Sequence, residues 1–569
     1  MRLSAFHFAV LSAALLLPVS VMAAAPVATA GVVAAGPVLP KLVLTDQILY
    51  QYLVAEFALQ RGDLGLSSEA YLDLAKATRD PRIAKRATEV ALYAQQGQEA
   101  EAAAKLWLDL NPQSADARQA VVAILLSEGK SADALPYLQQ LLSAHPENAA
   151  DEFMHLGEML GNQTDKVVSL DLIKTLAQAY PNLPEAHLAV AQAAARAGRF
   201  DLALTELDTV DRLKPDWDIA ALLRFEILSR NGKTDGESFV QNYLQRNPDA
   251  KDVRLAYARY LLNHNHLRES RSQFELLAKA LPNNAAMQLA IGLISLQMNE
   301  LDTAEAAFKM ALQEHYADPG VVQIYLGQVA EARHRDDEAG SWYRAVSTGP
   351  QFIPAQIRYA VLLAKQGKLD QARAYLHAVK VDSDADRVQL IQAEAELLGD
   401  AKDDNAAYKV LGDALATRPD SIDLLYDHAM AAERLNHLDV MESDLRHLLQ
   451  LQPNHAQALN ALGYTLVDHN IRLNEALDLL QQALKLAPND PYILDSMGWA
   501  QYRLGKLPAA AAYLKQAYQG LADPEIAAHL GEVLWVQGKH AEAQQVWQTA
   551  LLDSPKNQAL LDVMAKYKQ

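Results

Sequence analysis

The sequence predicts an all-α fold in which helix-turn-helix repeats stack into a superhelical solenoid. Gly463 recurs at Gly498, 35 residues on, and at Gly531, 33 residues after that. Prolines recur at intervals of 33 to 35 residues in two runs along the chain. Apolar residues follow a helical period from residue 45 to the end, and no sustained β alternation interrupts it. A fixed period near 34 residues is the signature of stacked helical repeats.

The first residues have the layout of a secretory signal peptide, which we place at residues 1–23. Met1-Arg2 is a short positive start, an apolar run covers residues 6–22, and small residues around Ala23 suit cleavage. The alternative is an uncleaved anchor, although the run is short for a membrane span and contains Pro18. Residues 24–43 are rich in Ala, Val, Gly and Pro and are expected to be a flexible linker. These features favour a periplasmic or secreted protein.

Residues 44–555 are expected to form the solenoid, in which a closing proline ends each unit. Proline has no amide N–H to donate, so it ends the second helix and starts the turn. The closing prolines are Pro112, Pro146, Pro181, Pro215, Pro248, Pro282, Pro419, Pro453 and Pro488. Small residues let the two helices of a unit approach, as Ala191 and Ala194 do opposite Leu207 in the unit 184–215. We expect about fifteen units, an atypical first unit and a C-terminal capping helix at residues 556–569.

Composition narrows the class of function. The net charge is −19, from 51 basic and 70 acidic residues, and no basic run suits a nucleic-acid backbone. The chain has no cysteine, which excludes disulfides, cysteine-ligated zinc, a thiol nucleophile and a lipid anchor through cysteine. The sequence contains no phosphate-binding loop, no zinc-protease motif and no nucleophile elbow. We therefore expect no enzymatic activity, no cofactor and no metal.

What remains is a surface for binding proteins, on the first helix of each repeat. Side chains that packing does not need face the groove there. In the three clearest repeats these positions hold Asn460, Tyr464, Asp495, Trp499, Tyr502, Arg503, Glu532 and Trp535. Aromatic side chains with a few polar groups suit an extended peptide or a partner helix. Packing between adjacent repeats is the alternative for Trp499 and Trp535, whereas Trp547 is expected to pack.

The order of large apolar residue, Gly, Ala, bulky residue, Ala and Pro resembles the tetratricopeptide repeat (TPR) family. Four segments also look like a group of TPR proteins of the Gram-negative outer membrane. They are Leu44–Gly62, Arg79–Ala87, Tyr492–Gly505 and Asp523–Trp535. The resemblance covers most of residues 44–555, and its end motifs are more specific than the repeat pattern.

This resemblance implies a right-handed superhelix and a non-enzymatic scaffold at the outer membrane. In that group, an adaptor binds a periplasmic carboxyl-terminal processing protease and presents peptidoglycan hydrolases to it. The group's adaptor is lipid-anchored through a cysteine, which this chain lacks. The alternative function is a TPR component of an exopolysaccharide-export or secretion assembly.

Overall fold

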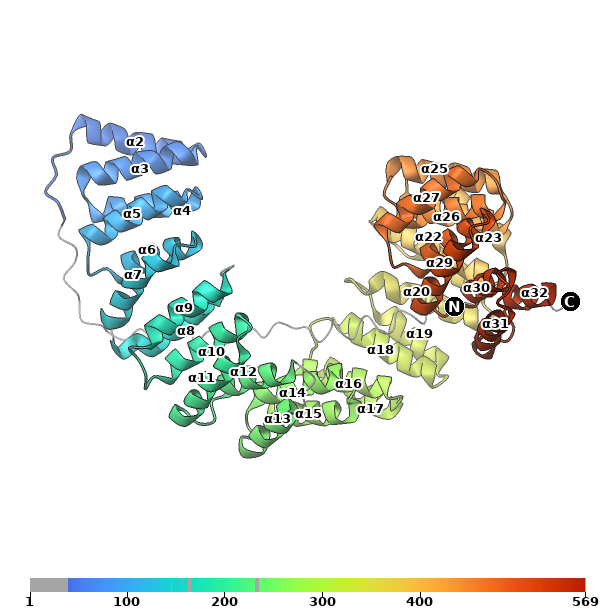
Figure 1. Ribbon diagram of the computed structural model, residues 1–569, viewed down its shortest axis with the longest axis horizontal. Coiled ribbons are helices and arrows are strands. Elements are labelled where there is room, and N and C mark those ends of the chain that lie inside the picture. The colour runs from blue at the N-terminus through green and yellow to red at the C-terminus, as the bar shows by residue number, and fades with distance from the viewer. Residues whose placement is uncertain (1–38, 145, 162–164, 231–234, 568–569) are drawn as a thin grey trace. The chain divides into compact units, whose positions relative to one another are not determined.

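The computed structural model describes residues 39–144, 146–161, 165–230 and 235–567 (Figure 1). The predicted signal peptide and most of the predicted linker lie outside these residues. Every regular element in the described ranges is a helix, so the prediction of an all-α fold is confirmed there. The chain divides into two compact units, residues 1–307 and 308–569.

The first unit contains the helices α2 to α16, and α17 crosses its boundary. Their bounds are α2 Asp46–Gln60, α3 Leu64–Thr78, α4 Pro81–Tyr93, α5 Gly97–Leu110, α6 Ala115–Ser127, α7 Ser131–Ala144, α8 Ala149–Gly161, α9 Lys166–Ala177, α10 Pro184–Arg196, α11 Phe200–Leu213, α12 Asp218–Ser229, α13 Asp235–Arg246, α14 Lys251–Asn263, α15 Leu267–Ala280, α16 Ala285–Gln297 and α17 Leu301–Gln313. A short 3-10 helix, η2 Pro146–Asn148, precedes α8.

The second unit contains α18 to α32. Their bounds are α18 Pro319–Ala332, α19 Asp336–Ala345, α20 Phe352–Lys365, α21 Leu369–Ala378, α22 Asp384–Asp400, α23 Asp404–Leu415, α24 Ile422–Arg434, α25 Leu438–Leu451, α26 Ala456–Asp468, α27 Leu473–Leu486, α28 Pro491–Arg503, α29 Leu507–Gly520, α30 Pro524–Val536, α31 His540–Asp553 and α32 Gln558–Lys566.

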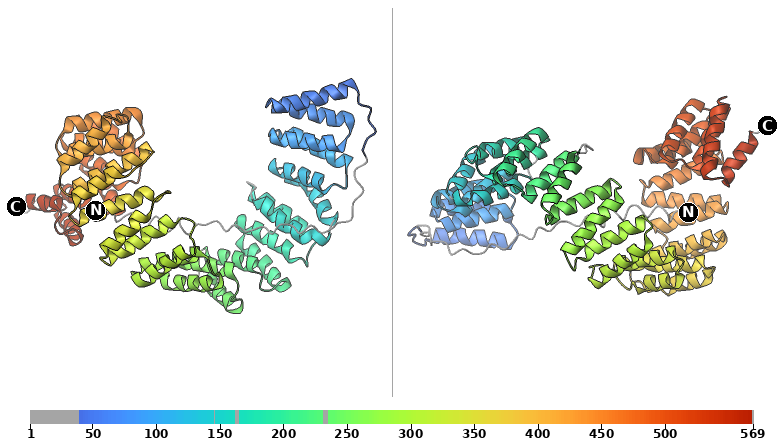
Figure 2. Two further views of the ribbon diagram at one scale, coloured as in Figure 1. Left: turned by 180° about the vertical axis from the view of Figure 1, so that it is seen from behind. Right: turned by 90° about the horizontal axis from the view of Figure 1, so that it is seen from below.

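Consecutive helices pair as hairpins, from α2 with α3 to α14 with α15 in the first unit and from α18 with α19 to α30 with α31 in the second, and α32 follows the last pair. Together with α16 and α17, which follow one another in the same order, the described residues hold fifteen consecutive helix pairs, in agreement with the predicted repeat number. Within each unit, neighbouring hairpins lie side by side (Figures 1 and 2). All nine closing prolines lie in a turn or at the start of η2, as predicted.

A side chain six residues after a closing proline caps the proline's carbonyl in several repeats. The Arg118 guanidinium donates to the Pro112 carbonyl at 2.7 Å, and Arg254 donates in the same way to the Pro248 carbonyl at 2.9 Å. In another repeat the equivalent residue is His187, whose Nε2 lies 3.0 Å from the carbonyl oxygen of Pro181. These bonds satisfy backbone oxygens in the turn that would otherwise need water.

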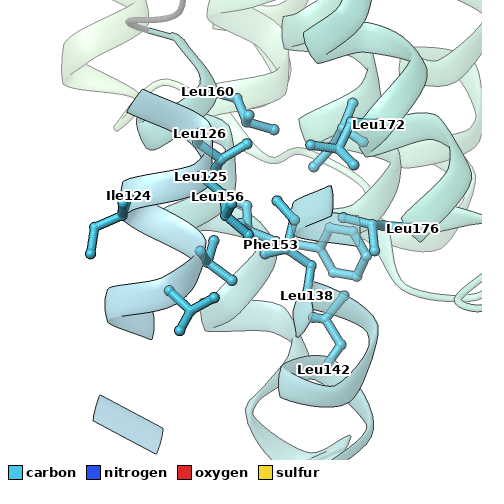
Figure 3. Close-up of a cluster of buried hydrophobic side chains, with 14 of the residues drawn as sticks. Ile124, Leu125, Leu126, Leu138, Leu142, Phe153, Leu156, Leu160, Leu172 and Leu176 are labelled. Carbon is cyan, nitrogen blue, oxygen red and sulfur yellow. The ribbon is translucent and has the colours of Figure 1, made fainter. Parts of the chain in front are cut away.

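Buried aliphatic and aromatic side chains form a continuous core through consecutive hairpins. In the first unit this core runs from α2 to α12. Figure 3 shows part of it, where leucines of α6, α7, α8 and α9 surround Phe153. Because each hairpin buries its faces only against its neighbours, stability is a sum of hairpin and interface terms.

The two helices of a hairpin make their closest contact at a small residue of the first helix. A Cβ built on Gly498 would lie 2.6 Å from Leu514 Cγ, and one on Gly463 would lie 2.8 Å from Leu480 Cγ. Gly531 lies in the same way against the indole of Trp547, which is only 2 % exposed. Trp547 is thus a core residue of the second helix, as expected.

We predict that Gly498→Ala destabilises the second unit by about 1–3 kcal/mol, because the new methyl overlaps Leu514 and a backbone carbonyl. Gly399→Ala is the matched control. Gly399 is also helical and has nothing within 4 Å of its Cβ position, so alanine should stabilise there by about 0.5–1 kcal/mol. Urea unfolding followed by circular dichroism measures both. Equal effects at the two positions would contradict the close-contact account.

Candidate functional site: the first-helix face of the last repeats

The predicted binding residues lie on α26, α28 and α30, the first helices of the last three hairpins. These helices pack directly on one another, and α32 packs on α30. Side chains one repeat apart therefore become neighbours in space. We call the surface formed by α26, α28, α30 and α32 the first-helix face.

Trp499 lies at the centre of the first-helix face and is 7 % exposed. Its indole stacks on the His529 imidazole, with ring centroids 4.2 Å apart and planes 21° apart. The indole N–H donates to Asp468 Oδ1 at 3.4 Å. Tyr464 is half-buried, and its ring centroid lies 6.3 Å from that of His529. Trp499 thus has packing contacts with both neighbouring repeats, and little of its side chain reaches the surface.

Asp495 and His529 form a buried polar pair between α28 and α30. His529 Nδ1 lies 3.0 Å from each carboxylate oxygen of Asp495, which is 8 % exposed. Burial lowers the pKa of His529, but the hydrogen bond and the charge of Asp495 raise it by more, so the net shift is upward. The pair therefore favours an imidazolium facing a carboxylate.

Glu532 joins three helices of the first-helix face through one carboxylate oxygen. That oxygen accepts from the Tyr502 hydroxyl at 3.0 Å, from Lys566 Nζ at 2.8 Å and from the Tyr567 hydroxyl at 3.2 Å. Burial, followed by the charge of Glu532, raises the pKa of Tyr502. The glutamate is 9 % exposed, so its main role is to hold α28 and α32 against α30.

Trp535 takes part in a separate aromatic cluster near the C-terminus. Its ring stacks on His540 with centroids 4.2 Å apart and on Trp547 with centroids 5.8 Å apart. Tyr567 lies beside it, at 5.6 Å between centroids. The half-buried Trp535 therefore contacts α31 and the chain after α32.

An open cleft of about 540 Å³ lies on the first-helix face. Its lining includes the side chains of Trp499, Tyr502, Arg503, Leu507, Glu532, Val536 and Lys566. Arg503 is exposed, and its guanidinium donates to the Asp468 carbonyl at 3.2 Å. The cleft combines aromatic and aliphatic surface with two cationic groups at its edge, which suits a peptide segment that carries apolar and acceptor groups.

Four of the eight predicted residues, namely Trp499, Tyr502, Arg503 and Glu532, line this one cleft. Asp495 pairs with His529 outside the lining of the cleft, Trp535 belongs to the other cluster, and the remaining two lie on α26. One of these, Asn460, has a buried Oδ1 with no hydrogen-bond partner among the described residues. The binding role of all eight stays a prediction.

Sequence reasoning missed His529, Lys566 and Tyr567, which complete the polar contacts of the first-helix face. His529 precedes the repeat glycine by two positions, which carries no signal of its own. The other two residues follow the last repeat, where the repeat pattern stops. Only the packing of α32 on α30 brings them to Glu532.

The described ranges contain neither a cluster of metal ligands nor a membrane-spanning helix. No three His, Asp or Glu side chains there gather closely enough to hold a metal ion. Each helix in those ranges is too short or too polar to cross a bilayer.

We predict that the Asp495–His529 pair stabilises the second unit most at acid pH. The pKa of His529 is raised on folding, so this stabilisation is complete below about pH 6.5, the usual histidine value, and is lost as pH rises through the folded value. The difference in melting temperature between the wild type and Asp495→Asn should therefore be larger at pH 6 than at pH 9. A difference that stays constant between these pH values would contradict a charged pair.

Comparison with known proteins agrees with the repeat architecture. The family model for the tetratricopeptide repeat matches residues 255–321, 426–491 and 496–559. The TPR repeat-containing protein PA4667 of Pseudomonas aeruginosa is 34% identical over 490 residues, which covers 86% of this chain and 82% of the relative. Bacteriophage adsorption protein A of Escherichia coli is 34% identical over 73 residues, 13% of this chain and 7% of that protein.

A solved structure with a similar fold is the APC/C hetero-tetramer Cut9-Hcn1. The alignment with it covers 86% of this chain and 97% of the chain in that structure, at 16% identity and a TM-score of 0.29. The match to PA4667 extends over most of both proteins, and proteins built from such repeats serve as scaffolds for protein–protein interaction. The chain belongs to the tetratricopeptide repeat family.

Proposed function

We propose that this TPR scaffold is a non-enzymatic periplasmic adaptor. Its partners are a carboxyl-terminal processing protease and the peptidoglycan hydrolases that this protease cleaves. One observation carries the proposal. The segment Asp523–Trp535, which has the most specific resemblance to outer-membrane TPR proteins, also supplies α30 and hence His529 and Glu532 of the first-helix face.

The chemistry of the cleft supports a protein partner. Trp499, Leu507 and Val536 offer apolar surface, so a partner's aliphatic or aromatic side chain gains by leaving water there. Arg503 and Lys566 offer N–H donors for a partner's carboxylate or backbone carbonyl. Energy in such interfaces concentrates in a few aromatic and arginine contacts, which is the composition of this cleft.

An adaptor acts by holding two proteins on one chain. Tethering raises the effective concentration of a substrate near a protease to the millimolar range for short spans. No bond-making or bond-breaking group of the adaptor itself is needed. The fifteen hairpins provide many first-helix surfaces, so separate repeats can hold the protease and its substrate.

The test is affinity capture from a periplasmic extract with the wild type, Arg503→Ala and Lys409→Ala. We expect the wild type to recover a serine protease that carries a PDZ domain. Arg503→Ala should lower that recovery about tenfold, since arginine contacts are frequent hot spots. Lys409 pairs with Asp413 on the exposed side of α23, so Lys409→Ala is a control for loss of one surface charge in the same unit.

Three outcomes decide the proposal. Loss of the protease with Arg503→Ala alone supports the adaptor and its cleft. Equal recovery of the protease with both variants would show that the cleft takes no part in the interaction. Capture of polysaccharide-export or secretion components without a protease would favour the alternative assembly and contradict the adaptor.

A further inference from the structure

Large apolar side chains crowd the exposed surface at the start of the described chain. Nine of them, each between 41 % and 81 % exposed, lie within residues 39–57. They are Leu39, Leu42, Val43, Leu44, Leu49, Tyr50, Tyr52, Leu53 and Phe57. Isolated exposed apolar residues are ordinary, but a gathering of this density marks an interaction surface. It is also unusual for this position, since the end repeats of a solenoid need a polar outer face.

The exposed side chains of α2 form a stripe opposite its packing face. α2 packs on α3 through the buried Ala55 and Ala58. Leu49, Leu53 and Phe57 are spaced four residues apart, so they share the opposite side of the helix. The next first helix, α4, has a helix on each side, α3 and α5, whereas the outward side of α2 has no comparable cover among the described residues. Spacing of this kind is what a second helix packs against.

An apolar pocket of about 370 Å³ opens beside this stripe. Its walls include Leu44, Ile48, Leu49, Tyr52, Leu74 and Ile83. Leu49 belongs both to the stripe and to the wall of the pocket. A helix laid along the stripe can therefore insert a large side chain next to Leu49.

The charges around the stripe indicate which kind of molecule packs against it. Residues 39–62 contain two cations, Lys41 and Arg61, and two anions, Asp46 and Glu56, so their charge is balanced. Helices that lie on membranes have many cations on the polar face, which is not the case here. Asp46 lies in the first turn of α2, and Arg61 is its C-terminal cap residue. An antiparallel copy of α2 brings each Asp46 near the Arg61 of the other copy.

We propose that the outer face of α2 is a homodimer interface, in which two copies of the chain pack their α2 helices antiparallel. Leu53 lies near the two-fold axis and faces its own copy. The same symmetry places the partner's Phe57 opposite Leu49, where it enters the apolar pocket. The surface is self-complementary in the spacing of its apolar side chains and in charge, as a two-fold interface requires.

The absence of cysteine from the chain allows a direct test by single-cysteine cross-linking. Leu53→Cys should form a disulfide-linked dimer under mild oxidation at least about tenfold faster than Leu552→Cys, because disulfides need close Cα atoms. Leu552 is 83 % exposed on α31, far from α2 in the sequence, so it controls for collisions in solution. Equal cross-linking rates at the two positions would overturn the proposal.

Light scattering after size-exclusion chromatography tests the same interface without a cross-link. The wild-type chain should show a dimer that dissociates on dilution, and Leu53→Glu should be monomeric because two carboxylates then meet at the axis. Leu552→Glu should remain dimeric. Circular dichroism checks that each variant is folded, which is expected since both leucines are exposed.

Charge reversal distinguishes a second copy of the chain from other molecules that could bind the stripe. Asp46→Arg or Arg61→Asp alone should weaken the dimer, and the double variant should restore it, since only a copy of the chain carries both changes. A monomeric wild type would overturn the proposal. So would a monomer that binds phosphatidylcholine vesicles through the stripe.

Discussion

The structure depends on the close approach of two helices at a small residue in each repeat. Gly463, Gly498 and Gly531 have no Cβ, so Leu480, Leu514 and Trp547 of the second helices lie directly against them. This contact sets the angle and spacing of the two helices. Because α26, α28 and α30 also pack on one another, the same contact places His529 on Trp499 and Glu532 on Tyr502. The candidate binding surface is thus a consequence of backbone packing.

The hairpins could be predicted from the sequence because their determinants are local. Glycine, alanine and closing proline recur once per repeat, and each hairpin contacts only its neighbours. The start of α28 at Pro491 and of α30 at Pro524 follows from proline at the first helical position.

The details of the site could not be predicted in the same way. Burial of Trp499 depends on His529 in the next repeat, and the contacts of Trp535 depend on Tyr567 beyond the last repeat. The repeat pattern does not say which large residue of a first helix is covered by its neighbour. The same holds for α2, whose apolar residues lie all round the helix, so its exposed apolar side emerges only from the packing of α3.

The first and last hairpins differ in whether another helix covers their outer faces. At the C-terminal end, α32 covers α30 with the buried Leu560 and Val563. At the N-terminal end, α2 presents leucine and aromatic side chains outward. A stack that buries each hairpin against the next leaves its terminal faces uncovered unless a capping helix or another molecule covers them. This difference is the physical basis for the proposal that the chain self-associates through its N-terminal end and binds a partner elsewhere, on the first-helix face.

Hydrogen exchange after a single core truncation tests the central claim that the repeats are held by neighbour contacts. Phe274 is fully buried in α15, and Phe274→Ala should cost about 3–5 kcal/mol. The account predicts faster amide exchange in α14, α15 and α16, with α26 to α31 unchanged. A loss of protection spread equally over the whole chain would contradict it.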